Sequence, residues 1–377
     1  MMYIYKFLYI SVICFALYSL TGNAAPPDED KNDDISSYQI TKASHNLAKI
    51  TQSYNKNIVF CPQGVNVVER LAAVIPTPVF PVERTPDALQ DAFDRYVLKD
   101  DNDKILKQAN FVFSRDSLPQ QYKDLLESKG NPHIFDSSHN LKHAGDVADA
   151  NRIIAKLTDN ALEGVIRETD NFDFIVTNIV YFKGKWGVPC EKGGALIWKK
   201  NTAMLEEVDS FVTDPTNNIG IKAGETDGYN LFSLPVNEAK GKYKFIIAVP
   251  EDSSKTTPEQ AILNDKIALN CIKAARSAQQ LERNAFLTIP VFYIQQKHDL
   301  NPLFKSANRF EASQDVFIQV NEKGVEAAAY TKMLVFKSIS LNREIKIDKP
   351  FAYWILDQGS DKILFMGTVY DPEKHIN

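Results

Sequence analysis

Cysteine, glycine and surplus positive charge are all scarce in this sequence. The 377 residues include 4 cysteines, too few for a scaffold held together by disulfide bonds. The 16 glycines follow no period, which excludes a collagen-like or repeat architecture. The formal net charge of -5 argues against a nucleic-acid partner, because phosphate binding needs clustered positive charge. What the chain does have is 44% hydrophobic and 11% aromatic residues, enough for a large folded core.

The motifs of the common enzyme classes are missing as well. There is no Gly-x-Ser-x-Gly elbow, no glycine-rich phosphate loop and no His-Glu-x-x-His motif. His139 and His143 are the only histidine pair at helical spacing, and two ligands in a polar stretch rarely form a metal site. We therefore expect no enzymatic activity, no cofactor and no bound metal.

The first 24 residues have the pattern of a secretory signal peptide. Lys6 precedes an apolar run, and small residues follow it up to a cleavage position after Ala24. A transmembrane anchor is the alternative, but the run is shorter than the ~20 apolar residues that a spanning helix needs. The sequence therefore predicts a secreted, extracellular protein with no membrane partner. Residues 25–38 are acidic and nearly free of apolar side chains, which is typical of a flexible leader.

Residues 39–372 show no break in composition and are expected to form one domain, followed by a tail at 373–377. Helical spacing predicts helices in the first half, over 65–74, 88–96, 118–129 and 147–157, with one strand at 106–113. Nearly continuous apolar runs predict strands in the second half, over 174–182, 243–249, 286–293, 316–320, 351–356 and 363–369. Pro290 indicates that its strand lies at an edge or carries a bulge. Helices first and strands later indicate an α+β fold.

The stretch Val320-Asn-Glu-Lys-Gly-Val-Glu-Ala-Ala-Ala-Tyr-Thr331 is the least ordinary part of the chain. On its own, Glu-Ala-Ala-Ala would suit the start of a helix. The segment instead leads into about 25 residues without a regular pattern, and a loop of that length inside a compact domain is usually functional.

This stretch resembles the proximal hinge of the serpins, the serine-protease-inhibitor family. Three further stretches agree with the family pattern: Asn57-Ile-Val-Phe-Cys-Pro62, Thr177-Asn-Ile-Val-Tyr-Phe-Lys-Gly-Lys-Trp186, and Asp348-Lys-Pro-Phe351 with Ile363-Leu-Phe-Met-Gly-Thr-Val-Tyr-Asp-Pro372. The resemblance covers roughly residues 39–372. It implies three β-sheets, about eight or nine helices and an exposed reactive-centre loop.

The resemblance also implies a mechanism in which the loop is the working part. A target serine protease cleaves the loop and forms an acyl-enzyme, and the freed loop enters the main sheet as a new strand. The residues that would form the hinge are Glu322, Gly324, Val325, Glu326, Ala327, Ala328, Ala329 and Thr331. If Val325 faces the core, alternation also turns Ala327, Ala329 and Thr331 inward. Val325 and Tyr330 depart from the family, which usually has Thr or Ser at the first position and a small residue at the second.

A second group of residues departs from the family more seriously. Cys61 and Gly64 stand where serpins commonly have serines, and Gln314 stands where they often have histidine, while Asn178 is kept. In the family this hydrogen-bonded cluster controls how the main sheet opens. The departures therefore favour the alternative that the chain is a non-inhibitory carrier, decoy or signalling protein.

The family spacing also suggests where the loop would be cleaved. Counting 16 residues from Glu322 gives the bond Ser338–Ile339, which would suit an elastase-like protease. The adjacent bond Lys337–Ser338 offers a basic residue to a trypsin-like protease, and we prefer it. The expected partner is thus a serine protease, with trypsin-like specificity at the preferred bond, and the inhibitor is expected to be a monomer.

Overall fold

The computed structural model describes residues 28–51, 54–75, 106–130, 132–136, 144–158, 160, 162, 164–167, 172–182, 184–200, 204–236, 242–305, 310–325, 343–358 and 362–372. The chain divides into two compact units, Met1–Tyr38 and Gln39–Asn377. The second unit begins at the residue where the sequence analysis starts the domain. Helix α2 (Asp28–Ile50) begins inside the segment expected to be a leader.

The described residues contain six α helices and one short 3-10 helix, fewer than the eight or nine expected. They are α2, α3 (Pro62–Ala72), α5 (Gln120–Gly130), α6 (Ala144–Leu157), α7 (Pro258–Leu263), α8 (Asp265–Ser277) and η1 (Asn301–Leu303). The helix expected at 88–96 lies outside the described residues. Helices α7 and α8 interrupt the half of the chain where strands were expected to dominate. Thr257 caps α7 through a reciprocal pair of hydrogen bonds with Gln260, a start signal readable in the sequence.

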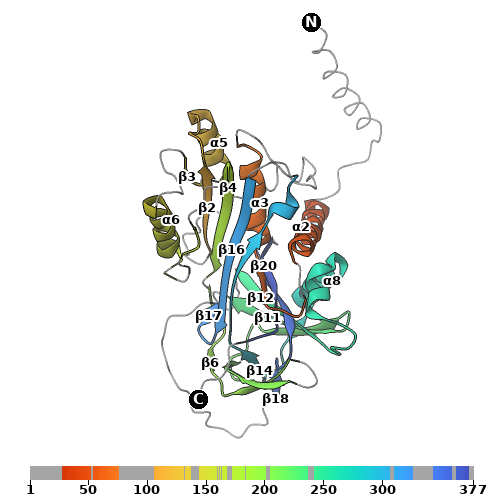
Figure 1. Ribbon diagram of the computed structural model, residues 1–377. Coiled ribbons are helices and arrows are strands. Elements are labelled where there is room, and N and C mark those ends of the chain that lie inside the picture. Colours follow the sequence, from red (N-terminus) through yellow and green to blue (C-terminus); the bar gives the residue numbers. More distant parts are fainter. Residues whose placement is uncertain are drawn as a thin grey trace, which may run out of the picture. The chain divides into compact units, whose positions relative to one another are not determined.

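The sheet that carries the site, here called the seam sheet, has two strands paired in parallel at its centre (Figure 1). These are β4 (Phe174–Phe182) and β16 (Phe310–Asn321), and we call their junction the seam. The remaining strands are β3 (His133–Phe135), β2 (Leu106–Ser114), β15 (Phe292–Asp299), β17 (Gly324–Val325) and β5 (Gly184–Lys185). Strands β2 and β3 lie beyond β4, and β15 pairs with the far edge of β16.

Two further sheets and a hairpin complete the β-structure. The core sheet is β1 (Ile58–Phe60), β20 (Lys362–Val369), β19 (Phe351–Asp357), β12 (Tyr243–Pro250), β11 (Tyr229–Val236), β10 (Lys222–Thr226) and β13 (Gln279–Gln280), in that order. The small sheet is β18 (Arg343–Lys346), β14 (Ala285–Pro290), β9 (Ser210–Thr213) and β6 (Cys190–Lys192). The hairpin is β7 (Leu196–Lys199) and β8 (Leu205–Val208). The three expected sheets are therefore present, with the hairpin in addition.

The segment at 286–293 differs from the single strand that was predicted. It forms the end of β14 and the start of β15, which belong to different sheets and are separated at Val291. Pro290 is the last residue of β14, and that strand lies between β18 and β9 rather than at an edge. A proline can end an interior strand because no further ladder hydrogen bond is required of it there.

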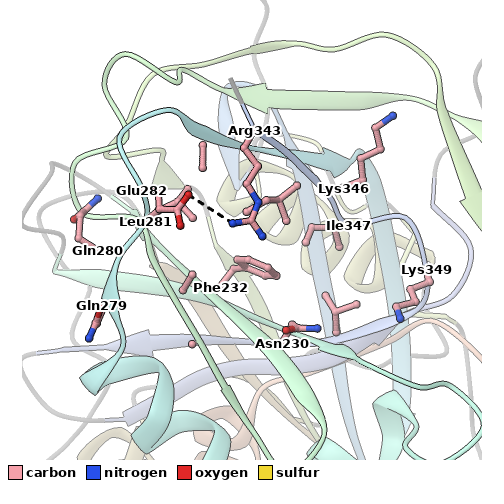
Figure 2. A pocket seen from close by; sticks show the side chains of 15 residues that line it. Asn230, Phe232, Gln279, Gln280, Leu281, Glu282, Arg343, Lys346, Ile347 and Lys349 are labelled. Carbon is pink, nitrogen blue, oxygen red and sulfur yellow. Dashed lines mark ion pairs between the residues drawn. The ribbon is translucent and has the colours of Figure 1, made fainter. Parts of the chain in front are cut away.

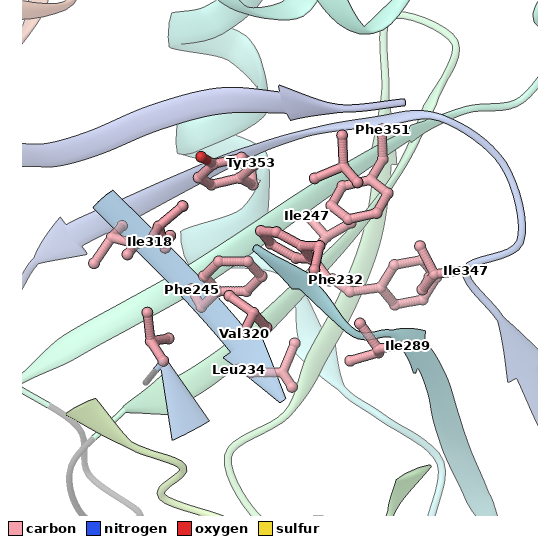
Figure 3. Packing of buried hydrophobic residues seen from close by; sticks show 14 of the residues in the cluster. Phe232, Leu234, Phe245, Ile247, Ile289, Ile318, Val320, Ile347, Phe351 and Tyr353 are labelled. Atoms are coloured by element: carbon pink, nitrogen blue, oxygen red, sulfur yellow. The ribbon is translucent and has the colours of Figure 1, made fainter. Parts of the chain in front are cut away.

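Alternation along β16 gives the seam sheet two different faces. Val316, Ile318 and Val320 point into the main hydrophobic cluster with Phe245 and Tyr353 (Figure 3). On the opposite face, Phe317 packs in a separate cluster with residues of helix α6. Both faces of the seam are therefore covered, which explains why β4 reads as an unbroken apolar run.

None of the helices in the described part of the chain combines the length and apolar character needed to cross a membrane. Cys61, Cys190 and Cys271 form no disulfide.

Candidate functional site

The seam is closed by direct pairing of its two strands. β4 and β16 run parallel from Phe174 opposite Phe310 to Tyr181 opposite Phe317. Over this stretch no strand lies between them. On the face toward α6, the Thr177 and Ser313 hydroxyls lie 2.7 Å apart and bridge the seam.

On the other face lie Asn178 and Gln314, together with Cys61 and Gly64 at the start of α3. Gln314 and Asn178 are in register across the seam and fully buried. The Gln314 amide accepts a hydrogen bond from the Cys61 N–H (3.1 Å) and donates to the Cys61 carbonyl (2.8 Å). It also donates to Asn178 Oδ1 at 3.3 Å. One side chain thus ties both seam strands to the start of α3, and we call this arrangement the seam clasp.

Gly64 makes room for the seam clasp on the first turn of α3. A Cβ at this position would overlap Asn178 Oδ1 and Gln314 Nε2, and would lie 2.8 Å from Asn178 Cγ. A side chain at residue 64 and the present arrangement of the two amides therefore exclude each other. A larger residue at position 64 would require the Asn178 amide to move first and the Gln314 amide as well.

The Cys61 thiol takes no part in the clasp's hydrogen bonds. Burial raises its pKa to about 12, although the backbone N–H groups of Gly64 and Gln63 act in the opposite direction. The thiol is therefore neutral at physiological pH and is not a nucleophile. Cys61 is hydrogen-bonded to Gln314 through its backbone N–H and its backbone carbonyl.

Asn110 belongs to the same network and was missed by the sequence analysis. It lies opposite Asn178 on β2, and its Oδ1 accepts a 2.8 Å hydrogen bond from Asn178 Nδ2. The available signal was an amide inside the apolar strand Asn110-Phe-Val-Phe-Ser114, since a buried polar side chain needs a partner. With Asn110 the clasp extends across three adjacent strands.

Asp315 is a second buried polar group on β16, on the face toward α6. Burial raises the pKa of its carboxyl to about 6, with Lys297 acting in the opposite direction. Its Oδ2 has no hydrogen-bond partner among the described residues. The side chain therefore carries a proton more readily in the folded protein than in the unfolded chain.

The hinge starts where β16 turns back on itself. Val325 pairs with Val320, and Gly324 with Asn321, so Glu322 and Lys323 form a tight turn. Gly324 has φ +142, and a Cβ there would overlap the Gly184 carbonyl oxygen. Glycine is required because this backbone conformation and this close approach both exclude a side chain.

The two residues of β17 are already held as a strand at the end of the seam. β17 pairs with β16 on one side and with β5, which follows β4 in the chain, on the other. Val325 is fully buried in the main hydrophobic cluster, so its side chain faces the core. Trp186 donates a 2.7 Å hydrogen bond from Nε1 to the Asn321 carbonyl and so fixes the turn.

The other predicted loop residues lie outside the described residues. They are Glu326, Ala327, Ala328, Ala329 and Thr331 of the hinge, and Lys337, Ser338 and Ile339 of the two candidate reactive bonds. Among the residues that the structure describes, no group of three or more His, Cys, Asp or Glu side chains could hold a metal ion.

Comparison with known proteins identifies the relatives of this chain. The family model described as serpin (serine protease inhibitor) matches residues 81–312 and 307–372. Mouse neuroserpin is 24% identical over 322 residues, covering 74% of this chain and 75% of its own. Serpin-Z10 of Arabidopsis thaliana is 26% identical over 392 residues, covering 92% of this chain and 98% of its own.

Solved structures agree at the level of the fold. A thyroxine-binding globulin complex with thyroxine superposes with a TM-score of 0.70 at 16% identity, covering 90% of this chain and 100% of that one. Serpin48 of the insect Tenebrio molitor gives 0.65 at 17% identity, covering 92% and 100%. The α+β architecture, the hinge and the family model agree, and the chain belongs to the serpin family.

Proposed function

We propose that the protein is a secreted serine-protease inhibitor whose cleaved loop enters the seam as a new strand between β4 and β16. The observation that carries the proposal is the position of β17, which begins such a strand and has a neighbour on each side. The signal-like pattern of residues 1–24 supports secretion.

The two registers of β17 predict where each following residue would lie. In an antiparallel pairing the two residue numbers of every pair add up to the same value. For β17 with β16 this value is 645 (325 and 320), and for β17 with β5 it is 509 (325 and 184). Continued without a bulge, Ala327 would lie between Ile318 and Phe182, because 645 minus 327 is 318 and 509 minus 327 is 182. The neighbours on both sides belong to the main hydrophobic cluster, so a small side chain at this position avoids overpacking.

The same two registers predict that Thr331 would lie at the seam clasp. It would lie between Gln314 (645 minus 331) and Asn178 (509 minus 331), which are themselves paired in the closed seam. Insertion would therefore have to break the 3.3 Å hydrogen bond between these two amides. The Thr331 hydroxyl can donate and accept, so it can replace that bond on either side.

The chemistry of inhibition requires only that the loop be a substrate. The target's catalytic serine attacks the carbonyl of Lys337, the Ser338 amine leaves with a proton, and an ester joins the loop to the protease. Ser338–Ile339 is the alternative bond. Insertion would then carry the ester away before water completes the reaction. Lys337 favours a trypsin-like target, and the inhibitor would act as a monomer.

The test mixes the purified protein with trypsin or elastase and separates the products on a denaturing gel. A stable band at the summed mass is expected, and sequencing of the released C-terminal peptide identifies the reactive bond. A protease whose catalytic serine is replaced by alanine should give no such band. Cleavage without any complex, by every protease tried, would refute the inhibitory function.

A pair of hinge variants ties the outcome to insertion. Ala329→Arg should convert the protein from inhibitor to substrate, because residue 329 would enter the packed face between Val316 and Val180. Glu326→Arg is the matched control, because residue 326 would lie beside Gln319 (645 minus 326), which is only partly buried and belongs to neither hydrophobic cluster. Equal loss of complex in both variants would contradict the proposed register.

A non-inhibitory serpin acting as a carrier, decoy or signalling protein is the second candidate. The observation in its favour is the seam clasp, in which Gln314 makes one hydrogen bond across the seam and two to the Cys61 backbone at the start of α3. Loop cleavage that yields neither a complex nor a gain in heat stability would support this alternative.

A further inference from the structure

A pocket of about 480 Å³ lies between the core sheet and the small sheet, away from the seam clasp and the hinge. Phe232, Val249 and Leu281, each 5–7% exposed, form an apolar floor, and Arg343 extends over it from the start of β18 (Figure 2). The volume is in the range of sites that hold a small organic molecule.

The charges around the pocket are of mostly one sign. Three of its four charged lining residues are cations, namely Arg343, Lys346 and Lys349, and only Glu282 is an anion. This local excess of positive charge stands out in a chain with a formal net charge of -5. An anionic group is therefore favoured at the rim over a cationic or neutral one.

Arg343 is the cation best able to receive a ligand's anionic group. Among the residues that the structure describes, it forms an ion pair with Glu282 at 3.5 Å, and the two side chains are 68% and 72% exposed. Pairs this exposed contribute little and are easily exchanged. By contrast, Lys349 donates to the Glu251 carbonyl at 2.9 Å, and Lys346 lies 3.4 Å from Glu344.

We propose that this pocket is a binding site for a small amphipathic carboxylate, whose apolar body covers Phe232 and Leu281 while its carboxylate pairs with Arg343. A guanidinium binds a carboxylate through two parallel hydrogen bonds, which a neutral ligand cannot provide. The proposal depends on the pocket alone and stands whether or not the protein inhibits a protease.

Such a ligand would also affect the loop. In the described residues β18 pairs only with β14, over four residues, and it follows the segment 326–342 directly. A ligand that contacts Arg343 and Ile347 as well as β11 and β13 would add a second attachment for β18. Ligand binding therefore holds β18 more firmly against the rest of the domain.

The site can be tested with anilinonaphthalenesulfonate as a fluorescent probe and dodecanoate as a competitor. Saturable binding of one probe per chain is expected, with displacement by dodecanoate and at least about tenfold weaker displacement by dodecanol. Arg343→Ala should weaken dodecanoate binding about tenfold. Asn230→Trp should abolish it by filling the pocket from an exposed position on β11.

Arg283→Ala is the matched control. This exposed arginine follows the lining residues Leu281 and Glu282 in the sequence but does not itself line the pocket. Circular dichroism should show native folding for every variant used. Bound dodecanoate should also slow hydrogen exchange at Arg343 and Ile347, whose N–H groups donate to Asn284 and Thr288. Equal displacement by dodecanol, equal weakening by Arg283→Ala, or unchanged exchange in β18 would overturn the proposal.

Discussion

Replacing Gly64 by alanine tests whether the seam clasp is packed as tightly as its geometry indicates. Gly64 lies in helix α3, where alanine is intrinsically more favourable than glycine by about 1 kcal/mol. If the site had room, Gly64→Ala would raise the free energy of unfolding. The overlap of the new Cβ with the Asn178 and Gln314 amides predicts the opposite sign.

The magnitude follows from two costs and one gain. Overpacking a buried site costs about 1–3 kcal/mol, and loss of the Gln314–Asn178 hydrogen bond costs about 1 kcal/mol more. Subtracting the helix gain of about 1 kcal/mol leaves a net destabilisation of about 1–3 kcal/mol. Urea unfolding followed by circular dichroism measures this change.

Gly145→Ala provides the control for the helix term. Gly145 lies in helix α6, and a Cβ there would meet no atom within 4 Å. This variant should be unchanged in stability or stabilised by up to about 1 kcal/mol. If Gly64→Ala were as stable as the parent protein, the clasp could not be packed as described.

Three further changes probe the hinge and the buried acid. Gly324→Ala should destabilise the protein by about 1–3 kcal/mol, because residue 324 has a positive φ and a Cβ there would overlap the Gly184 carbonyl oxygen. An unchanged free energy of unfolding in urea would argue against this turn. Trp186→Phe should cost about 1 kcal/mol and speed hydrogen exchange at Gly324 and Val325, since it removes the bond to Asn321; unchanged exchange would exclude this role for the indole. Because the folded-state pKa of Asp315 is raised from 3.8 to about 6, its contribution to stability is full below about pH 4 and falls by up to about 3 kcal/mol as the pH rises through 6. Asp315→Asn should remove this pH dependence, and an identical pH profile in the variant would contradict the assignment.

The sequence predicted the site residues better than it predicted their arrangement. Asn178, Cys61, Gly64 and Gln314 could be named from family motifs, and the inward position of Val325, which the sequence analysis only assumed, is seen in the structure. The fit between Gly64 and the Gln314 amide could not be predicted, because it depends on the packing of helix α3 against β16, between residues 250 positions apart. Only the folded structure shows that the two departures from the family occupy the same space.

The errors in the fold have a similar origin. A continuous apolar run at 286–293 looks like one buried strand, and the break at Val291 depends on the chain passing from the small sheet to the seam sheet. Helices α7 and α8 were not predicted, because the segments on both sides of them have strong strand patterns. Thr257, Pro258 and Gln260 nevertheless carry a capping signal that marks the start of α7. Local signals identify elements, whereas sheet membership is set by tertiary contacts.

The most direct test of strand insertion is the thermal unfolding midpoint before and after cleavage of the loop at Lys337–Ser338 or Ser338–Ile339. Limited proteolysis supplies the cleaved protein, and the two fragments are kept together without denaturant. A new strand that pairs with both β4 and β16 should raise the midpoint by roughly 10 °C or more. An unchanged or lower midpoint after verified cleavage would contradict the claim that the seam accepts the loop.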